Sequence, residues 1–260
     1  MTELLPNPAT AISYDIVGSS AGGYTRHNEL LSATENAVTA IIEASPYPGQ
    51  WVRSNRGDGE VTVALSGIPG AWILARFLPE LHAALVGYNA NKSVEHRLLL
   101  RVGVAFGDVL VDNGMPRGGD ALVMAARLRD DNAAYEAFDA VPAAQVVAMI
   151  SDAAYERAVP HHAMGLESRR FRRVRTRIEG RPATGWLHVP HHEPPVVTGA
   201  EPNAPAAQKP APEPAKAEPV KKKPAKKKPS EGAKYHTEIE GGTNAVGDRP
   251  TAVSWGSEPS

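Results

Sequence analysis

The 260-residue sequence contains no cysteine. This excludes a disulfide framework and a thiolate zinc site, and it fits a reducing compartment. The formal net charge is −1 at pH 7, so no field of one sign over the whole chain indicates a nucleic acid or an acidic substrate. No apolar run approaches the ~20 residues that span a bilayer, and residues 1–11 lack the basic start and apolar core of a signal peptide. We therefore expect a soluble, cytoplasmic protein without a membrane span.

Hydrophobic residues make up 42% of the chain, which is ample for one core, but they are unevenly distributed. We expect one folded domain over residues 1–190. From residue 191 the composition shifts to Pro, Ala, Lys and Glu, which cannot bury a core, so residues 191–233 are predicted to be a disordered linker. Residues 234–260 regain β-type residues and Gly/Asn turns, and they form a short C-terminal tail.

The most informative stretch covers residues 98–130, and it reads LLLRVGVAFGDVLVDNGMPRGGDALVMAARLRD. Residues 98–106 predict a buried strand, Gly107-Asp108 a tight turn, and residues 109–111 the start of a return strand. A glycine-rich loop follows. From Asp120 the apolar residues fall at helical spacing, so Arg127 is expected late in a helix.

Two aspartates upstream sit at places where strands end. Asp15 lies near the end of a short strand predicted over residues 11–17, before a glycine-rich loop whose amides suit phosphate oxygens. Asp58 lies between two glycines, at the apex of a hairpin predicted from strands 50–55 and 60–65. Either aspartate alone reads as an ordinary turn residue. Together they favour a metal site.

The remaining pattern predicts helices over residues 28–45, 68–90 and 152–159, a strand over 143–150, and a final hairpin over 171–189. The order of elements indicates an α+β fold with one mainly antiparallel sheet and helices packed on one face. Six arginines gather before and along the first strand of the final hairpin, and they read as a solvated sheet face or as a site for triphosphate or nucleic acid: Arg169, Arg170, Arg172, Arg173, Arg175 and Arg177. Nucleic acid is the weaker alternative because no aromatic platform is interleaved with them.

Four short motifs, in order over residues 10–160, resemble those of class III nucleotide cyclases, the adenylate and guanylate cyclase family. They are Asp15-Ile16-Val17-Gly18, Gly57-Asp58-Gly59, Arg101-Val102-Gly103 with Gly107-Asp108-Val109, and Gly119 to Leu128 (GDALVMAARL). The resemblance implies the ferredoxin-like cyclase fold. It also implies conversion of a nucleoside triphosphate to a 3′,5′-cyclic nucleotide and pyrophosphate with two Mg²⁺ or Mn²⁺ ions.

The resemblance also implies roles for individual residues. The metal ions fall to Asp15, Ile16 and Asp58, and Arg127 stabilises charge on the α-phosphate. In this family the metal carboxylates and the arginine come from opposite protomers, so a head-to-tail homodimer with two composite sites is implied. The substrate-binding candidates are Gly18, Ser19, Ser54, Arg56, Arg117 and Val123.

The sequence departs from the family pattern at three positions. The ribose-positioning asparagine falls at Val123, which cannot hydrogen-bond, and this puts activity in doubt. The purine-reading residue falls at Ser54 and the second base-reading position near residues 115–117, which puts the base in doubt. Arg53, Asn55 or Arg56 are alternatives for base contact. A pyrimidine substrate, as in bacterial anti-phage cyclases, stays open.

Competing functions also stay open. One is a catalytically silent cyclase-like domain that dimerises and presents the C-terminal tail to a partner protein. Residues 235–255 loosely resemble the amyloid-like signalling peptides of bacterial conflict proteins, which pair edge to edge. A diguanylate cyclase, suggested by Gly118-Gly119-Asp120, is discounted because that motif needs a hairpin apex and here it precedes a helix.

Overall fold

The computed structural model describes residues 5–19, 21–55, 60–178 and 180–201. The strands are β1 Asn7–Ile16, β2 Trp51–Asn55, β3 Glu60–Ala64, β4 Leu100–Asp112, β5 Met115–Gly118, β6 Val146–Ser151, β7 Arg172–Ile178 and β8 Arg181–His188. The α-helices are α1 Gly23–Ala44, α2 Gly70–Trp72, α3 Leu78–Asn89, α4 Asp120–Arg129, α5 Asn132–Ala140 and α6 Asp152–Ala158. A π-helical turn, η1 Ile73–Phe77, joins α2 to α3, and three short 3₁₀ turns complete the set: η2 Val94–His96, η3 Ala163–Gly165 and η4 Ser168–Arg170.

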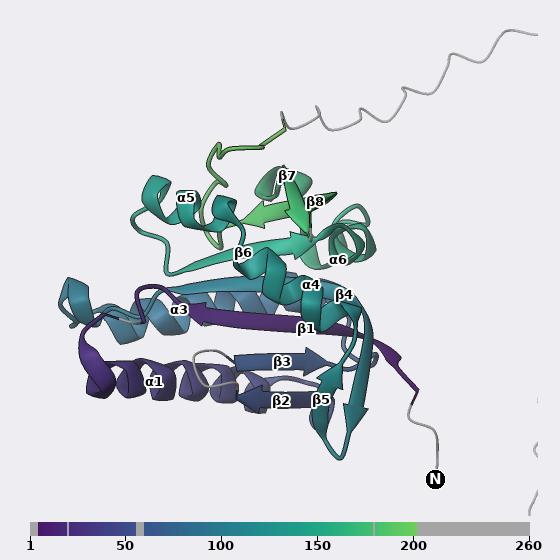
Figure 1. Ribbon diagram of the computed structural model, residues 1–260, viewed down its shortest axis with the longest axis horizontal. Coiled ribbons are helices and arrows are strands. Elements are labelled where there is room, and N and C mark those ends of the chain that lie inside the picture. Colours follow the sequence, from purple (N-terminus) through teal and green to yellow (C-terminus); the bar gives the residue numbers. More distant parts are fainter. Residues whose placement is uncertain (1–4, 20, 56–59, 179, 202–260) are drawn as a thin grey trace, which may run out of the picture. The chain divides into compact units, whose positions relative to one another are not determined.

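One sheet organises the described part of the chain, in the strand order β2-β3-β1-β4-β6-β8-β7, with β5 paired to β4 outside this path (Figure 1). The β4–β6 pair is parallel, and the other pairs of described strands are antiparallel. The long central pair of β1 and β4 runs from Asn7 opposite Val109 to Ile16 opposite Leu100. The predicted α+β fold with a mainly antiparallel sheet is confirmed.

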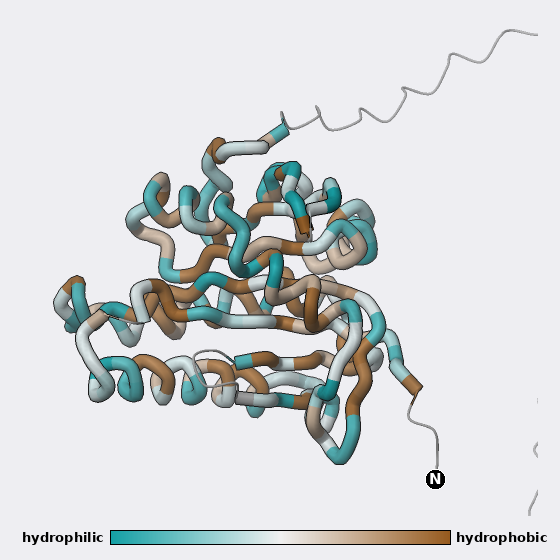
Figure 2. Tube along the Cα trace, in the orientation of Figure 1, coloured by the Kyte–Doolittle hydropathy of each residue, from teal (hydrophilic) through white to brown (hydrophobic). Residues whose placement is uncertain are grey.

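Helices cover both faces of this sheet, so the prediction that they pack on one face was wrong. α1, the α2–η1–α3 helix and α6 bury large side chains, including Leu30, Phe77 and Tyr155, against one face. α4 packs on the opposite face against small residues of β1 and β4, such as Ala11 and Ala105, and α5 extends this layer over β6. Because side chains alternate along a strand, β1 sends Ile12 to the first face and its neighbours to the second. Figure 2 shows hydrophobic and hydrophilic residues alternating along α1, as expected of a helix with one buried side.

The predicted turn at Gly107-Asp108 was also wrong, because β4 continues through both residues. The chain turns instead at Asn113 (φ 49°) and Gly114 (φ 71°), the left-handed pair that a two-residue hairpin requires. Gly103 of β4 serves helix packing. A Cβ atom on Gly103 would lie 1.8 Å from the carbonyl oxygen of Ala125 in α4, whereas one on Gly107 would meet Ala121 at 3.6 Å, an ordinary contact. The approach of α4 to the strand therefore needs a residue without a side chain at Gly103.

The chain continues past β8 along the edge of the sheet, as far as Glu201 within the described residues. The amide of Arg175 donates to the carbonyl of Gly199 at 2.8 Å, and the amide of Glu201 donates to the carbonyl of Arg173 at 2.9 Å. Residues 199–201, which the composition assigned to the linker, therefore pair with the outer edge of β7. No helix in the described part of the chain has the length and apolarity needed to cross a membrane.

Candidate active site

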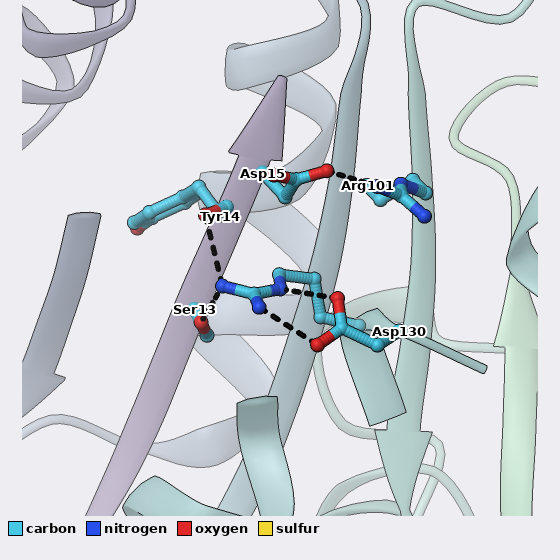
Figure 3. Close-up of polar contacts among 6 residues, drawn as sticks. Ser13, Tyr14, Asp15, Arg101 and Asp130 are labelled. Carbon is cyan, nitrogen blue, oxygen red and sulfur yellow. Dashed lines mark hydrogen bonds and ion pairs between the residues drawn. The ribbon is translucent and has the colours of Figure 1, made fainter. Parts of the chain in front are cut away.

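The face of the sheet under α4 and α5 carries a buried ion pair at the end of β1. Asp15 and Arg101 are directly opposite each other on β1 and β4, and a guanidinium nitrogen of Arg101 contacts Oδ2 of Asp15. Both are mostly buried, with 16% of the Asp15 side chain and 9% of the Arg101 side chain exposed. Figure 3 shows the two side chains pointing toward each other. The pairing supplies the counter-charge that a carboxylate needs when it is held away from water.

Arg101 is a candidate functional residue that the sequence reasoning missed. Its guanidinium lies 3.7 Å from the centre of the Tyr135 ring of α5, and its buried Nε and Nη1 atoms make no hydrogen bond to any described residue. A cation with unsatisfied donors beside a carboxylate is suited to an anionic ligand. A signal was present: Arg101 is the one charge in an otherwise apolar strand sequence, LLLRVGVAF. It was read as part of a family motif and given no role.

The oxygen donors fit a hard divalent cation only in part. Asp15 offers a carboxylate and Ile16 a backbone carbonyl, which are ligand types that Mg²⁺ and Mn²⁺ prefer. The Ile16 carbonyl already accepts a hydrogen bond from the amide of Ser19 at 3.2 Å. Asp58 and Arg56 lie outside the described residues, and no group of three His, Asp or Glu side chains within the described ranges is arranged to hold a metal ion. A second carboxylate is therefore needed to complete the site.

Arg26 of α1 holds the loop that follows Asp15 through hydrogen bonds. One guanidinium nitrogen of Arg26 donates to the carbonyls of Gly18 at 2.9 Å and Ala21 at 2.6 Å, and its Nε donates to the carbonyl of Glu95. Gly18 has φ 67°, a conformation that favours glycine. These bonds turn carbonyls toward Arg26 and hold the predicted phosphate loop against the start of α1.

On α4 two arginines have different surroundings. Arg129 binds both carboxylate oxygens of Asp130 at 2.8 Å and reaches across to β1, where it donates to Oγ of Ser13 at 3.1 Å (Figure 3). Arg127 is exposed and lines an open hollow of about 650 Å³ together with Arg175 and Arg177 of β7. Two aspartates, Asp130 and Asp131, also line the hollow. Arg127, the residue chosen from the sequence, therefore stands in a basic depression, whereas Asp15 does not line it.

Two arginines of strand β7 form ion pairs with one glutamate, Glu201. Arg173 and Arg175 bind Glu201 at 3.0 and 2.5 Å, and their hydrogen bonds and charges hold the pKa of that carboxyl below its ordinary value. Arg175 stays largely exposed all the same. The strand thus presents a solvated face, and it also contributes two cations to the hollow beside Arg127.

The residues predicted to contact the nucleotide base and ribose lie on different elements and have different surroundings. Arg53 points into the layer under α1, where it binds Glu60 and donates to Oγ1 of Thr39 at 2.6 Å. Its guanidinium therefore already has partners within the domain. Ser54 lies half-buried on β2, opposite Val61. Arg117 on β5 is exposed and 3.6 Å from Asp112. Val123 is exposed on α4, with 48% of its surface accessible.

Comparison with known proteins supports the fold. No protein-family model matches the sequence, and no curated protein matches it. Among solved structures, a bacterial light-regulated adenylyl cyclase matches with a TM-score of 0.52 at 13% identity, over 74% of this chain and 56% of that chain. The adenylate/guanylate cyclase/hydrolase from Silicibacter pomeroyi matches with a TM-score of 0.48 at 20% identity, over 72% of this chain and 99% of that one. The guanylyl cyclase Cya2 matches with a TM-score of 0.48 at 14% identity, over 72% and 95%.

The similarity to the light-regulated adenylyl cyclase shows that this chain has the class III nucleotide cyclase fold, as its motifs predict. The resemblance seen in the sequence is therefore confirmed at the level of fold. Because fold alone does not fix function, activity has to be argued from the residues of the site.

Proposed function

We propose that this protein is a nucleotide cyclase that converts a nucleoside triphosphate to a 3′,5′-cyclic nucleotide and pyrophosphate. The observation that carries the proposal is the pair of Asp15 and Arg101 at the end of the central strands of a cyclase fold. A carboxylate for a cation and a guanidinium for a phosphate lie together there, on the face that α4 covers. The base is left open, and a pyrimidine is among the candidates.

Two Mg²⁺ or Mn²⁺ ions, held by Asp15, the Ile16 carbonyl and Asp58, would supply charge neutralisation at the triphosphate and activation of the ribose hydroxyl. The chain's own residues do the remaining work in this proposal. Arg101 exchanges part of its contact with Asp15 for phosphate oxygens, using the buried donors that have no partner among described residues. Arg26 keeps the Gly18–Ala21 loop in place, so that Ser19 faces the phosphates.

Arg127 acts from a second copy of the chain in this proposal. Within one chain, Asp15 does not line the hollow that contains Arg127. A head-to-tail homodimer is therefore needed to bring Asp15 and Arg127 to one triphosphate. Exposed Val123 and Met115, on α4 and β5, supply apolar surface for that contact. Arg175 and Arg177 enlarge the positive potential around Arg127, which favours a polyanionic substrate.

A catalytically silent, cyclase-like dimerisation domain is the second candidate. It is favoured by two observations: the Asp15 carboxylate is already paired with Arg101, and Val123 offers no hydrogen bond to a ribose. In that case the fold would present the C-terminal tail to a partner protein. The two candidates differ in whether Asp15 and Arg127 are needed for turnover.

The test is turnover by the purified full chain with each of the four nucleoside triphosphates and Mn²⁺, with the product identified by mass. We expect a cyclic nucleotide from one of them, and we expect Asp15→Asn and Arg127→Ala each to lower the rate by at least about a hundredfold. When the two inactive variants are mixed, random exchange should restore about a quarter of parental activity, because half the dimers contain one intact site of two.

Circular dichroism and size-exclusion chromatography of each variant serve as controls for folding and subunit exchange. A protein that forms dimers but makes no cyclic product from any of the four nucleotides would support the silent domain. Full activity of Arg127→Ala would remove this arginine from the mechanism.

A further inference from the structure

A partly open cavity lies on the other face of the sheet, apart from Asp15, Arg101 and Arg127. Its volume is about 140 Å³, and it is bounded by the first half of β1, by β4, by η1 and by α6. Its wall is largely apolar, with Ile68, Leu74, Val104 and Ala154 among the lining residues. An apolar cavity of about 150 Å³ in another protein admits benzene, so this one has room for a group of that size.

Among the described residues that line this cavity, Arg157 of α6 alone carries a charge. Its guanidinium carbon lies 4.0 Å from the centre of the Phe106 ring, which also lines the cavity. No hydrogen bond or ion pair joins Arg157 to any residue in the described ranges, so its planar donors stay available at the edge of the cavity. A guanidinium that is held over an aromatic ring and has free donors is suited to a carboxylate, which it binds with two parallel hydrogen bonds.

The helix that borders the cavity is irregular at this point. Leu74 belongs to the π-helical turn η1, which interrupts the helix between α2 and α3. A π-helical turn is rare, and it occurs in many proteins at functional sites because the wider turn repositions side chains. Pro79, in the first turn of α3, has no amide hydrogen to donate to the carbonyl of Ala75, so the local sequence itself accounts for the irregular turn. The irregular turn and the cavity thus coincide on Leu74.

We propose that this cavity binds a small carboxylic acid whose apolar body is about the size of a benzene ring. The body would occupy the space between Leu74 and Val104, and the carboxylate would pair with Arg157. A carboxylate is favoured over a neutral ligand because Arg157 is the charged group at the edge of the cavity and no lining acid competes for it. This site is independent of cyclase activity.

Binding of benzoate and of benzyl alcohol to the full-length protein, measured by ligand-observed NMR titration, tests the proposal. The two probes share the ring and differ in charge. We expect benzoate to bind at least about tenfold more tightly than benzyl alcohol. Arg157→Gln should remove this difference by weakening benzoate alone. Ala154→Leu, which fills the cavity, should abolish binding of both probes.

Arg76→Gln is the matched control, because Arg76 is an exposed arginine of η1 that does not line the cavity. It should bind both probes like the parent protein. Absence of benzoate binding would overturn the proposal, and so would equal affinity for the two probes or an equal loss in Arg76→Gln. Arg157 is exposed, so its substitution leaves the fold intact and keeps the test decisive even if Ala154→Leu does not fold.

Discussion

The two faces of the sheet are built from different side chains. The face under α1, α3 and α6 buries large apolar residues such as Phe77 and Leu85, and burial lowers the pKa of its histidines His82 and His188. It also holds an ion pair between Arg53 of β2 and Glu60 of β3. The face under α4 is built mainly of small residues, glycine, alanine and valine, and it holds the charged side chains of Asp15 and Arg101 close to the helix layer. The first face stabilises the domain through burial of apolar area. The second brings a helix close to the sheet and keeps charges in place, which a face chosen for stability alone does not need.

The largest effect is expected from adding one methyl group to the face under α4, where the helix lies close to the sheet. This is the thin face. Gly103→Ala would place a Cβ atom 1.8 Å from the backbone oxygen of Ala125, and α4 cannot yield there without losing its contacts to the sheet. We expect a loss of about 4 kcal/mol in the free energy of unfolding, or failure to fold. Urea denaturation followed by circular dichroism measures it.

Gly107→Ala is the matched control in the same strand. Its new methyl group would meet Ala121 at 3.6 Å, an ordinary contact. We expect a change within about 1 kcal/mol. Similar losses for both variants would mean that close helix packing does not distinguish the two glycines.

The thin face also explains where sequence reasoning succeeded and failed. Strands with β-branched alternation and the helix that carries Arg127 follow from local pattern, so β1, β2, β3 and α4 were predictable. Gly107 was mistaken for a turn because Gly-Asp is a common hairpin dipeptide, whereas here the pair lies inside β4 and Gly107 has no positive φ. The true turn, Asn113-Gly114, carried the standard signature and was read only as a loop.

Two other features were missed, for different reasons. α5 carried a local signal that was not used: Asp131 caps it by accepting from the amide of Ala133, and its buried residues Ala133, Ala134 and Ala137 fall at helical spacing. Arg101 was given no role because its partner Asp15 lies 86 positions earlier in the chain. Pairing of that kind is visible only once the register of β1 and β4 is known. Asp58, the second predicted metal carboxylate, lies outside the described residues and stays a prediction.

The face under α1, α3 and α6, the thick face, should lose stability when side-chain atoms are removed rather than added. Leu85 of α3 is fully buried, so Leu85→Ala leaves a cavity that the surrounding helices fill only partly. We expect a loss of about 3 kcal/mol in the free energy of unfolding, measured by urea denaturation. Val86→Ala, at the next position, is the control: Val86 is 47% exposed, and its change should stay within about 0.5 kcal/mol. Equal losses at the two positions would contradict the assignment of this helix side to the core.

The smallest effect concerns the exclusion of a charge from the part of the thick face around His188, and it depends on pH. His188 of β8 stacks on Phe171 with its Nδ1 2.9 Å from the carbonyl oxygen of Arg170. Burial lowers the pKa of His188 from 6.5 to about 4. The unfolded chain therefore binds a proton at a pH where the folded chain does not. The contribution of His188 to stability is fully present above pH 6.5 and is lost as the pH falls toward 4.

Between pH 7.5 and pH 5 this loss should amount to about 2 kcal/mol for His188. Burial, with the neighbouring His191 and His192, lowers the pKa of His82 to about 4 as well, so the parent protein loses more than one histidine can explain. The prediction is therefore a difference: His188→Asn should lose about 2 kcal/mol less than the parent over this range, in urea denaturation at each pH. His96→Asn, at an exposed position, should lose as much as the parent. The plots of unfolding free energy against pH for His188→Asn and the parent protein could instead stay parallel. The folded chain would then bind a proton on His188 as readily as the unfolded chain does. In that case the thick face tolerates charge at this position, as the thin face does at Asp15 and Arg101.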